Sequence, residues 1–104
     1  MARVTSPPFE ELGPGEEQLS GDWIDTPRGP YGDAVEQRIF WLVTERLEAL
    51  GAADGGWDWL FRDPRDGRLW ELTHPQGSLH GRGPRQLTLI TPQAAAAKYD
   101  LPVR

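Results

Sequence analysis

Two alternating aromatic segments on either side of a tight turn constrain the fold more than any other feature. Residues 57–63 (Trp-Asp-Trp-Leu-Phe-Arg-Asp) and 68–74 (Arg-Leu-Trp-Glu-Leu-Thr-His) flank Pro-Arg-Asp-Gly at 64–67. Alternation of large apolar and polar residues is typical of half-buried strands. Proline presets the first turn dihedral, and glycine can adopt the left-handed conformation that closes the turn. The sequence therefore predicts a β-hairpin.

A four-residue loop at 64–67 sets the expected register of this hairpin. That register separates a strongly aromatic face from a mixed one, and a slip by one residue would blend the two. The expected cross-strand pairs are Asp63–Arg68, Phe61–Trp70, Trp59–Leu72 and Trp57–His74. The aromatic face contains Trp57, Trp59, Phe61, Trp70 and Leu72, and the mixed face contains Asp58, Leu60, Arg62, Leu69, Glu71 and Thr73.

A long helix is predicted from Asp33 to Leu50. Asp33 is a favourable N-cap, and Glu36 stands where a capping box places its acid. Gly51 stands where a helix terminator is favoured, and residues 52–56 would form a flexible link. The aromatic hairpin face is expected to pack on this helix. Its apolar stripe is Val35, Ile39, Leu42, Val43, Leu47 and Leu50.

Weaker signals complete the expected fold. They predict an edge strand within 19–26, a strand at 85–91, and a terminal helix at 94–99 with Thr91 as N-cap and Pro92 at its first position. We therefore expect an α+β fold, in which a small antiparallel sheet (the central β-hairpin plus one or two further strands) packs on one long helix, with a short C-terminal helix.

The chain is expected to divide near residue 18. Residues 1–18 are rich in proline, glycine and glutamate, which predicts a flexible N-terminal arm that Phe9 or Leu12 would pin. Residues 19–104 would form a single α+β domain.

Charge and composition narrow the possible partners and compartment. Of the net charge of −5, residues 1–60 carry −8 (12 acids, 4 bases) and residues 61–104 carry +3 (4 acids, 7 bases). Direct nucleic-acid binding is not expected, because it needs clustered Lys and Arg. The acidity suits a basic protein partner, or simply solubility. No cysteine, secretory apolar segment or long apolar run is present, so we expect a soluble cytoplasmic protein without membrane contact.

Catalytic signatures are missing, and no cofactor or metal is expected. The two histidines, His74 and His80, could form a metal or acid–base site with Asp58 or Glu71. The hairpin register argues against this cluster, because it places His74 beside Trp57 and Glu71 on the other face.

Other conspicuous side chains admit both structural and binding interpretations. Glu71 is expected to pair diagonally with Arg62. The five tryptophans are expected mostly in the core, and any exposed one would be a candidate interface anchor. Five arginines near the hairpin tip and the following loop could contact an anion or be scattered surface charge: Arg62, Arg65, Arg68, Arg82 and Arg85.

Residues 56–84 resemble the immunity protein 27 family of bacterial polymorphic-toxin systems, and weaker similarity extends over about residues 19–99. The matching residues are Gly56-Trp57, Arg62-Asp63-Pro64, Asp66-Gly67-Arg68, Trp70-Glu71-Leu72-Thr73, Pro75-Gln76, His80-Gly81 and Gly83-Pro84.

The resemblance implies a cytoplasmic inhibitor, not an enzyme, that binds and neutralises a cognate toxin domain and so protects the producing cell. Glycine-rich loops on rigid hairpins are natural recognition elements, so we expect the loop after the hairpin and the acidic helix face to contribute. Two alternatives stay open: a protein-binding adaptor that uses the hairpin, and a small enzyme built on His80. The predicted partner contacts are Glu36, Glu45, Glu48, Arg62, Glu71, Gln76, His80, Arg82 and Arg85.

Overall fold

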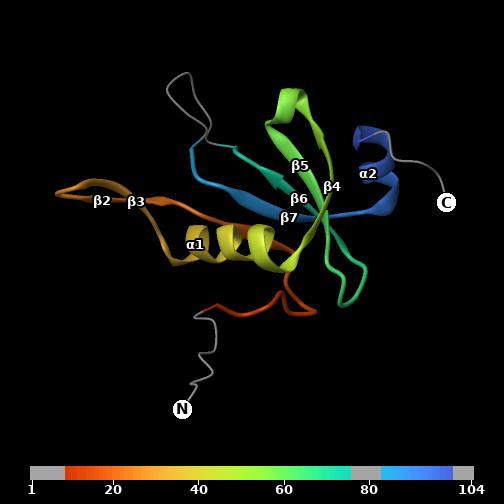
Figure 1. The fold of residues 1–104 in the computed structure, drawn as a ribbon, viewed down its shortest axis with the longest axis horizontal. Helices are drawn as coiled ribbons and strands as arrows, with labels where there is room; N and C mark the ends of the chain where they lie inside the picture. Colours follow the sequence, from red (N-terminus) through yellow and green to blue (C-terminus); the bar gives the residue numbers. More distant parts are fainter. Residues whose placement is uncertain (1–8, 76–82, 100–104) are drawn as a thin grey trace, which may run out of the picture.

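The computed structural model describes residues 9–75 and 83–99, and its architecture confirms the α+β prediction (Figure 1). A five-stranded antiparallel sheet has the order β1-β7-β6-β5-β4, and β2 and β3 form a separate two-stranded ribbon. No described helix is long and apolar enough to cross a membrane. The elements are β1 (Gln18–Ser20), β2 (Trp23–Thr26), β3 (Gly29–Gly32), α1 (Ala34–Trp41), the π-helical turn η1 (Leu42–Arg46), β4 (Glu48–Ala53), the 3-10 turn η2 (Asp54–Gly56), β5 (Asp58–Arg62), β6 (Leu69–Thr73), β7 (Gln86–Ile90) and α2 (Pro92–Tyr99).

The central hairpin, β5 and β6, has the register that the sequence predicts. Its cross-strand pairs include Trp59–Leu72 and Phe61–Trp70. The Asp63 amide donates to the Arg68 carbonyl at 2.9 Å, which closes the loop at 64–67. Gly67 adopts a φ of +80°, the left-handed conformation expected of this turn glycine.

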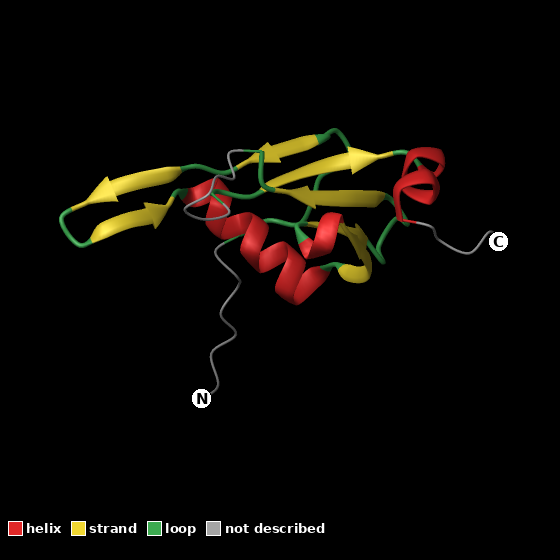
Figure 2. Cartoon of the chain, turned by 90° about the horizontal axis from the view of Figure 1, so that it is seen from above, coloured by secondary structure: helices red, strands yellow, loops and turns green. Residues whose placement is uncertain are grey.

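The main core lies between this hairpin and α1, as predicted. α1 and η1 cover one face of the sheet, where Ile39 and Leu42 are fully buried (Figure 2). Burying a large apolar side chain contributes about 1.5–3 kcal/mol. The other sheet face is partly covered by α2, whose Ala95 and Tyr99 pack on Leu60. The hairpin and sheet residues of the main core are Leu19, Phe61, Trp70, Leu72 and Leu87.

The long helix ends earlier than predicted, at Arg46 rather than Leu50. The Leu47 amide donates to the Leu42 carbonyl at 2.8 Å, which closes a π-type turn, and Leu47 itself is extended. The chain then enters β4, so Gly51 is no helix terminator but pairs with Leu60. The predicted flexible link is likewise part of β4 and η2. Strand pairing with β5 has overridden the helical spacing of the apolar residues.

The expected edge strand at 19–26 is two strands that belong to different sheets. β1 pairs with β7, whereas β2 pairs with β3 through a turn at 27–28. The ribbon of β2 and β3 extends from the body at the end opposite α2 (Figures 1 and 2). β7, α2 and the Thr91 N-cap follow the prediction, since the Ala94 amide donates to Thr91 Oγ1 at 3.1 Å.

The described part of the N-terminal segment lies against the domain. Leu12 is buried in the main core, and the Phe9 ring lies 6.0 Å from the Trp41 ring, so both expected anchors make contact. Residues 1–8 lie outside the described residues, and the division of the chain at residue 18 stays a prediction.

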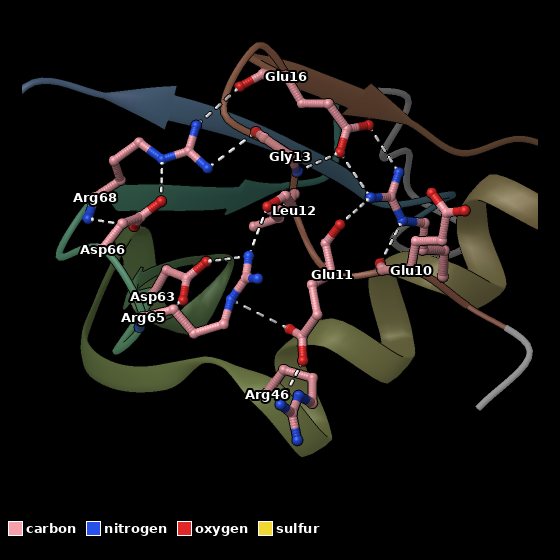
Figure 3. Close-up of polar contacts among 11 residues, drawn as sticks. Glu10, Glu11, Leu12, Gly13, Glu16, Arg46, Asp63, Arg65, Asp66 and Arg68 are labelled. Carbon is pink, nitrogen blue, oxygen red and sulfur yellow. Dashed lines mark hydrogen bonds and ion pairs between the residues drawn. The ribbon is translucent and has the colours of Figure 1, made fainter. Parts of the chain in front are cut away.

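Three arginines hold this segment mainly through its carbonyl oxygens. Arg38 donates to the carbonyls of Glu10 (2.9 Å) and Glu11 (3.0 Å). Arg65 donates to the Leu12 carbonyl at 2.6 Å (Figure 3). Arg68 donates to the carbonyls of Gly13 (3.0 Å) and Glu16 (3.3 Å) (Figure 3). The guanidinium groups thus satisfy main-chain acceptors that no strand pairing reaches.

Glu16 gives this attachment a pH dependence. Its carboxylate accepts from Arg38 at 2.7 and 2.8 Å, and this contact is the main reason that the pKa of Glu16 falls from 4.5 to about 2. Because the folded-state pKa is lowered, ionised Glu16 stabilises the fold above pH 4.5. That stabilisation is lost as the pH falls from 4.5 towards about 2.

We expect Glu16→Gln to remove this part of the acid sensitivity. Melting temperatures measured between pH 2 and 6 should fall less steeply on acidification in the variant than in the wild type, because the amide cannot titrate. Glu17→Gln is the matched control, since Glu17 is exposed and forms no ion pair within the described residues. Equal slopes for wild type and Glu16→Gln would contradict the assignment.

Candidate functional site: an aromatic groove beside α1

A concave surface on the α1 side of the molecule joins two hollows. One hollow of about 570 Å³ lies between the helix and strands β4 to β6, and the other, about 690 Å³, lies between the helix and the ribbon. Both are lined by Trp23, Phe40 and the ion pair of Glu36 and Arg85, so they form one surface. We call it the aromatic groove, defined by Trp23, Tyr31, Glu36, Phe40, Trp59 and Arg85.

Four aromatic side chains of the groove are exposed. The exposed fractions are 45% for Trp23, 62% for Tyr31, 51% for Phe40 and 37% for Trp59. The prediction that the tryptophans lie mostly in the core is therefore wrong: only Trp70 is fully buried, and Trp57 is also exposed at 41%. Grouped exposed aromatics on a small protein indicate an interaction surface.

An ion pair with a buried carboxylate forms the floor of the groove. Glu36 is 3% exposed, and its carboxylate accepts from the Arg85 amide at 2.8 Å and pairs with the Arg85 guanidinium. The same guanidinium lies 5.0 Å from the centre of the Phe40 ring, a cation–π contact. The pair thus fixes Phe40 relative to β7.

The expected capping box forms only in part. Asp33 caps α1 as predicted, because its Oδ1 accepts from the Glu36 amide at 2.8 Å. The Glu36 carboxylate does not accept a hydrogen bond from the Asp33 amide, however. The Asp33 amide donates instead to the Asp22 carbonyl at 2.9 Å, which leaves the Glu36 carboxylate for Arg85.

Two glycines close tightly on Glu36 from the ribbon side. A Cβ atom at Gly21 would lie 2.9 Å from Glu36 Cα, and one at Gly32 would lie 2.6 Å from Glu36 Cγ. Such distances leave no room for a side chain. The Gly21 amide also donates to the Arg85 carbonyl at 2.8 Å. Contacts with Gly21, Gly32 and Arg85 therefore hold the Glu36 side chain at the floor of the groove in one position.

The structure brings together only some of the residues that the sequence singles out. Glu36 and Arg85 meet in the groove, and exposed Glu45 lines its ribbon-side hollow. Glu48 and Arg62 pair with one another across β4 and β5 at 3.3 Å. The predicted contacts Gln76, His80 and Arg82 lie outside the described residues.

Glu71 lies on the α2 side of the sheet and does not pair with Arg62, so that prediction is wrong. Its carboxylate accepts from Lys98 at 2.6 Å and from the Tyr99 hydroxyl at 2.7 Å. Lys98 also pairs with Asp58 at 2.7 Å. The hydrogen bond to Asp58 is the largest cause that raises the pKa of Lys98, and the bond to Glu71 is the second. Burial is the largest cause that raises the pKa of Tyr99, followed by the hydrogen bond of its hydroxyl to Glu71. These contacts dock α2 on the sheet.

The histidine site considered from the sequence is described only in part, because His80 lies outside the described residues. The ring of His74 lies 6.1 Å from that of Trp57, edge to face, and its Nδ1 is 3.2 Å from the Trp57 carbonyl. This confirms that the two residues face one another. In residues 9–75 and 83–99, no group of three His, Cys, Asp or Glu side chains could hold a metal ion.

The four described arginines of the expected basic cluster are each paired with acids of the same chain. The pairs are Arg62–Glu48, Arg65–Asp63, Arg65–Glu11, Arg68–Asp66 and Arg85–Glu36. Because acids of the same chain already neutralise these four guanidinium groups, the described part of this cluster offers no ready anion site.

Sequence reasoning missed the groove aromatics, although one signal was present. Phe40 and Trp41 are adjacent on α1, and neighbouring helical residues point about 100° apart. Both cannot face the same core, so one of them had to lie at the edge of the helix–sheet interface. Phe40 is the more exposed of the two.

Comparison with known proteins shows to which family the chain belongs. A sequence model of the immunity protein 27 family matches residues 28–91, more than half of the chain. The chain belongs to the immunity protein 27 family. No curated protein and no solved structure matches.

The immunity protein 27 match runs from the turn of the ribbon to the end of β7, so it includes α1, β4, β5 and β6. It contains both partners of the buried floor, Glu36 and Arg85, and the exposed Phe40 and Trp59. Trp23 precedes the matched residues. Most of the aromatic groove is thus built from the part of the chain that carries the immunity-protein similarity.

Proposed function

We propose that this protein binds and neutralises the cognate toxin domain of a bacterial polymorphic toxin system in the cytoplasm of the producing cell. The family match over residues 28–91 carries the proposal. An inhibitor of this kind works by binding, and most of the residues that define the aromatic groove lie in the matched region.

The groove has the physical properties that tight protein recognition requires. Binding energy concentrates in a few aromatic or arginine side chains, and rigid surfaces lose less entropy on association. Trp59 stands on a sheet strand, and its indole donates to the Gly56 carbonyl at 3.2 Å, which orients the ring. Phe40 stands on α1, where its ring contacts the guanidinium of the Arg85–Glu36 ion pair.

The loop predicted to contact the toxin adjoins this surface in the chain. Gly83 and Arg85 line the groove, and Gln76, His80 and Arg82 precede them in sequence, so we retain these three as proposed contacts. Glu45 at the groove is retained as well. Glu48, Arg62 and Glu71 hold ion pairs within the chain, so the proposal places the main contact on the groove side.

Capture of the partner followed by a toxicity assay tests the proposal. Tagged protein would be purified from host lysate at moderate salt, and co-purifying proteins would be identified by mass spectrometry. We expect one stoichiometric partner that arrests growth when expressed alone and is harmless when co-expressed with this chain. A partner without toxicity, or toxicity that co-expression does not relieve, would overturn the proposal. Several substoichiometric partners would favour the adaptor alternative.

A further inference from the structure

We infer that the aromatic groove receives a cationic segment of the toxin, whose Lys or Arg side chains lie across the exposed rings with their charges towards an acidic rim. This inference rests on the proposed function and specifies the chemistry of the partner surface.

The charges around the groove are predominantly negative. Arg85 is neutralised by Glu36, so the floor contributes no net positive charge. Glu45, which lines the ribbon-side hollow, forms no ion pair within the described residues. The same holds on the ribbon for Asp22, which precedes Trp23, and for Asp25 on β2, which outnumber the one unpaired cation there, Arg28 at the turn. A cationic partner would be drawn towards this rim, because complementary potentials steer association.

Acidic side chains on the opposite side of the sheet, unlike those near the groove, form ion pairs with cations of the same chain. Asp58 and Glu71 share Lys98, and Glu48 pairs with Arg62. Because these carboxylates already have cations, they attract a basic partner less strongly. The groove therefore combines apolar surface with negative charge that the chain leaves uncompensated.

Long cationic side chains match both properties of the groove. Their aliphatic stems pack on apolar surface while the charged group stays near water or acids. Their cations also bind aromatic faces, as Arg85 does at 5.0 Å from the Phe40 ring. The acidic rim would repel an acidic segment. A purely apolar segment would remove water from the carboxylates of the rim without supplying a hydrogen bond or a cation in its place.

Binding measurements on the captured toxin test this inference with matched variants. Trp59→Ala and Trp23→Ala should each weaken binding by about 30-fold or more, as expected of aromatic anchors. Glu45→Lys should weaken binding and flatten its dependence on salt, because a favourable charge contact becomes repulsive.

Two controls separate these effects from general ones. Glu17→Lys makes the same charge change at an exposed acid outside the groove, and Leu50→Ala shortens a side chain that is 37% exposed, like Trp59, on β4. Both should change affinity by about twofold or less. If the groove variants bind and neutralise the toxin like wild type, the immunity function stands and the groove inference is wrong.

A peptide probe tests the groove without the toxin. A short amphipathic Lys/Leu peptide and its Glu/Leu counterpart would be titrated against the full chain while tryptophan fluorescence is recorded. The Lys/Leu peptide should bind about tenfold or more tightly than the Glu/Leu peptide, with the difference reduced by Glu45→Lys but not by Glu17→Lys. Equal binding of both peptides, or an equal effect of both charge reversals, would overturn the inference even if no toxin is captured.

Discussion

Arg85→Ala should lower the free energy of unfolding by about 3 kcal/mol, because it leaves a buried carboxylate without its cation. The Glu36 side chain is 5% exposed, and after the substitution only the backbone amide of residue 85 would still donate to it. The Arg85 side chain itself is 30% exposed, so water can partly replace it, which sets the expected loss at the lower end for a broken buried pair. The contact of the guanidinium with the Phe40 ring would also be lost.

Urea unfolding of three further variants checks this assignment. Arg28→Ala removes an exposed arginine that forms no ion pair within the described residues, and it should change stability by about 0.5 kcal/mol or less. Adding Glu36→Gln to Arg85→Ala should recover part of the loss, because the buried group becomes neutral. Glu36→Gln alone supplies the reference for that comparison. Equal stability of the Arg85 and Arg28 variants would show that the pair does not stabilise the fold.

Trp70→Ala should destabilise the protein still more, by about 3–5 kcal/mol. Trp70 is fully buried at the centre of the main core, opposite Phe61 on the neighbouring strand. Small domains have total stabilities of about 5–15 kcal/mol, so this loss is a large fraction of the free energy of unfolding.

Trp70→Phe distinguishes the packing role of this residue from a polar one. The Trp70 Nε1 atom is buried and has no acceptor among the described residues, and the Arg68 guanidinium lies 5.0 Å from the ring. Phenylalanine loses apolar contact but also removes an unsatisfied donor, which itself costs about 1–3 kcal/mol. We therefore expect a loss well below that of Trp70→Ala in thermal and urea unfolding. Losses of equal size would indicate that the indole nitrogen has a partner.

The hairpin could be predicted because its information is local. Trp59 and Phe61 alternate with Leu60, and one turn joins the strands, so periodicity and turn chemistry give the same register. The N-caps Asp33 and Thr91 were predictable for the same reason, since each bonds an amide three residues away.

The end of the long helix could not be predicted from spacing alone. Leu47 and Leu50 continue the helical stripe, yet they lie at and beyond the turn into β4. β4 itself is rich in alanine and glycine, which have weak strand propensity. The strand forms because β5 provides a pairing edge, and that contact is invisible to a local pattern.

The aromatic groove could not be predicted from the sequence for a related reason. Glu36 meets Arg85, 49 residues further along the chain, so the carboxylate leaves the capping position that local sequence assigns to it. The separation of β1 from β2 likewise places Trp23 on a ribbon beside α1 instead of on the main sheet. The sequence identified several of the participating residues, but only long-range contacts decide which of them share a surface.

The arginine contacts to the segment at residues 10–16 have a consequence for sequence variation. Arg38, Arg65 and Arg68 bind carbonyl oxygens, which every amino acid possesses. Substitutions along the segment should therefore leave most of these bonds intact, apart from buried Leu12 and the ion-paired glutamates. Related chains can thus diversify the outer surface of this segment while its path over the domain is kept.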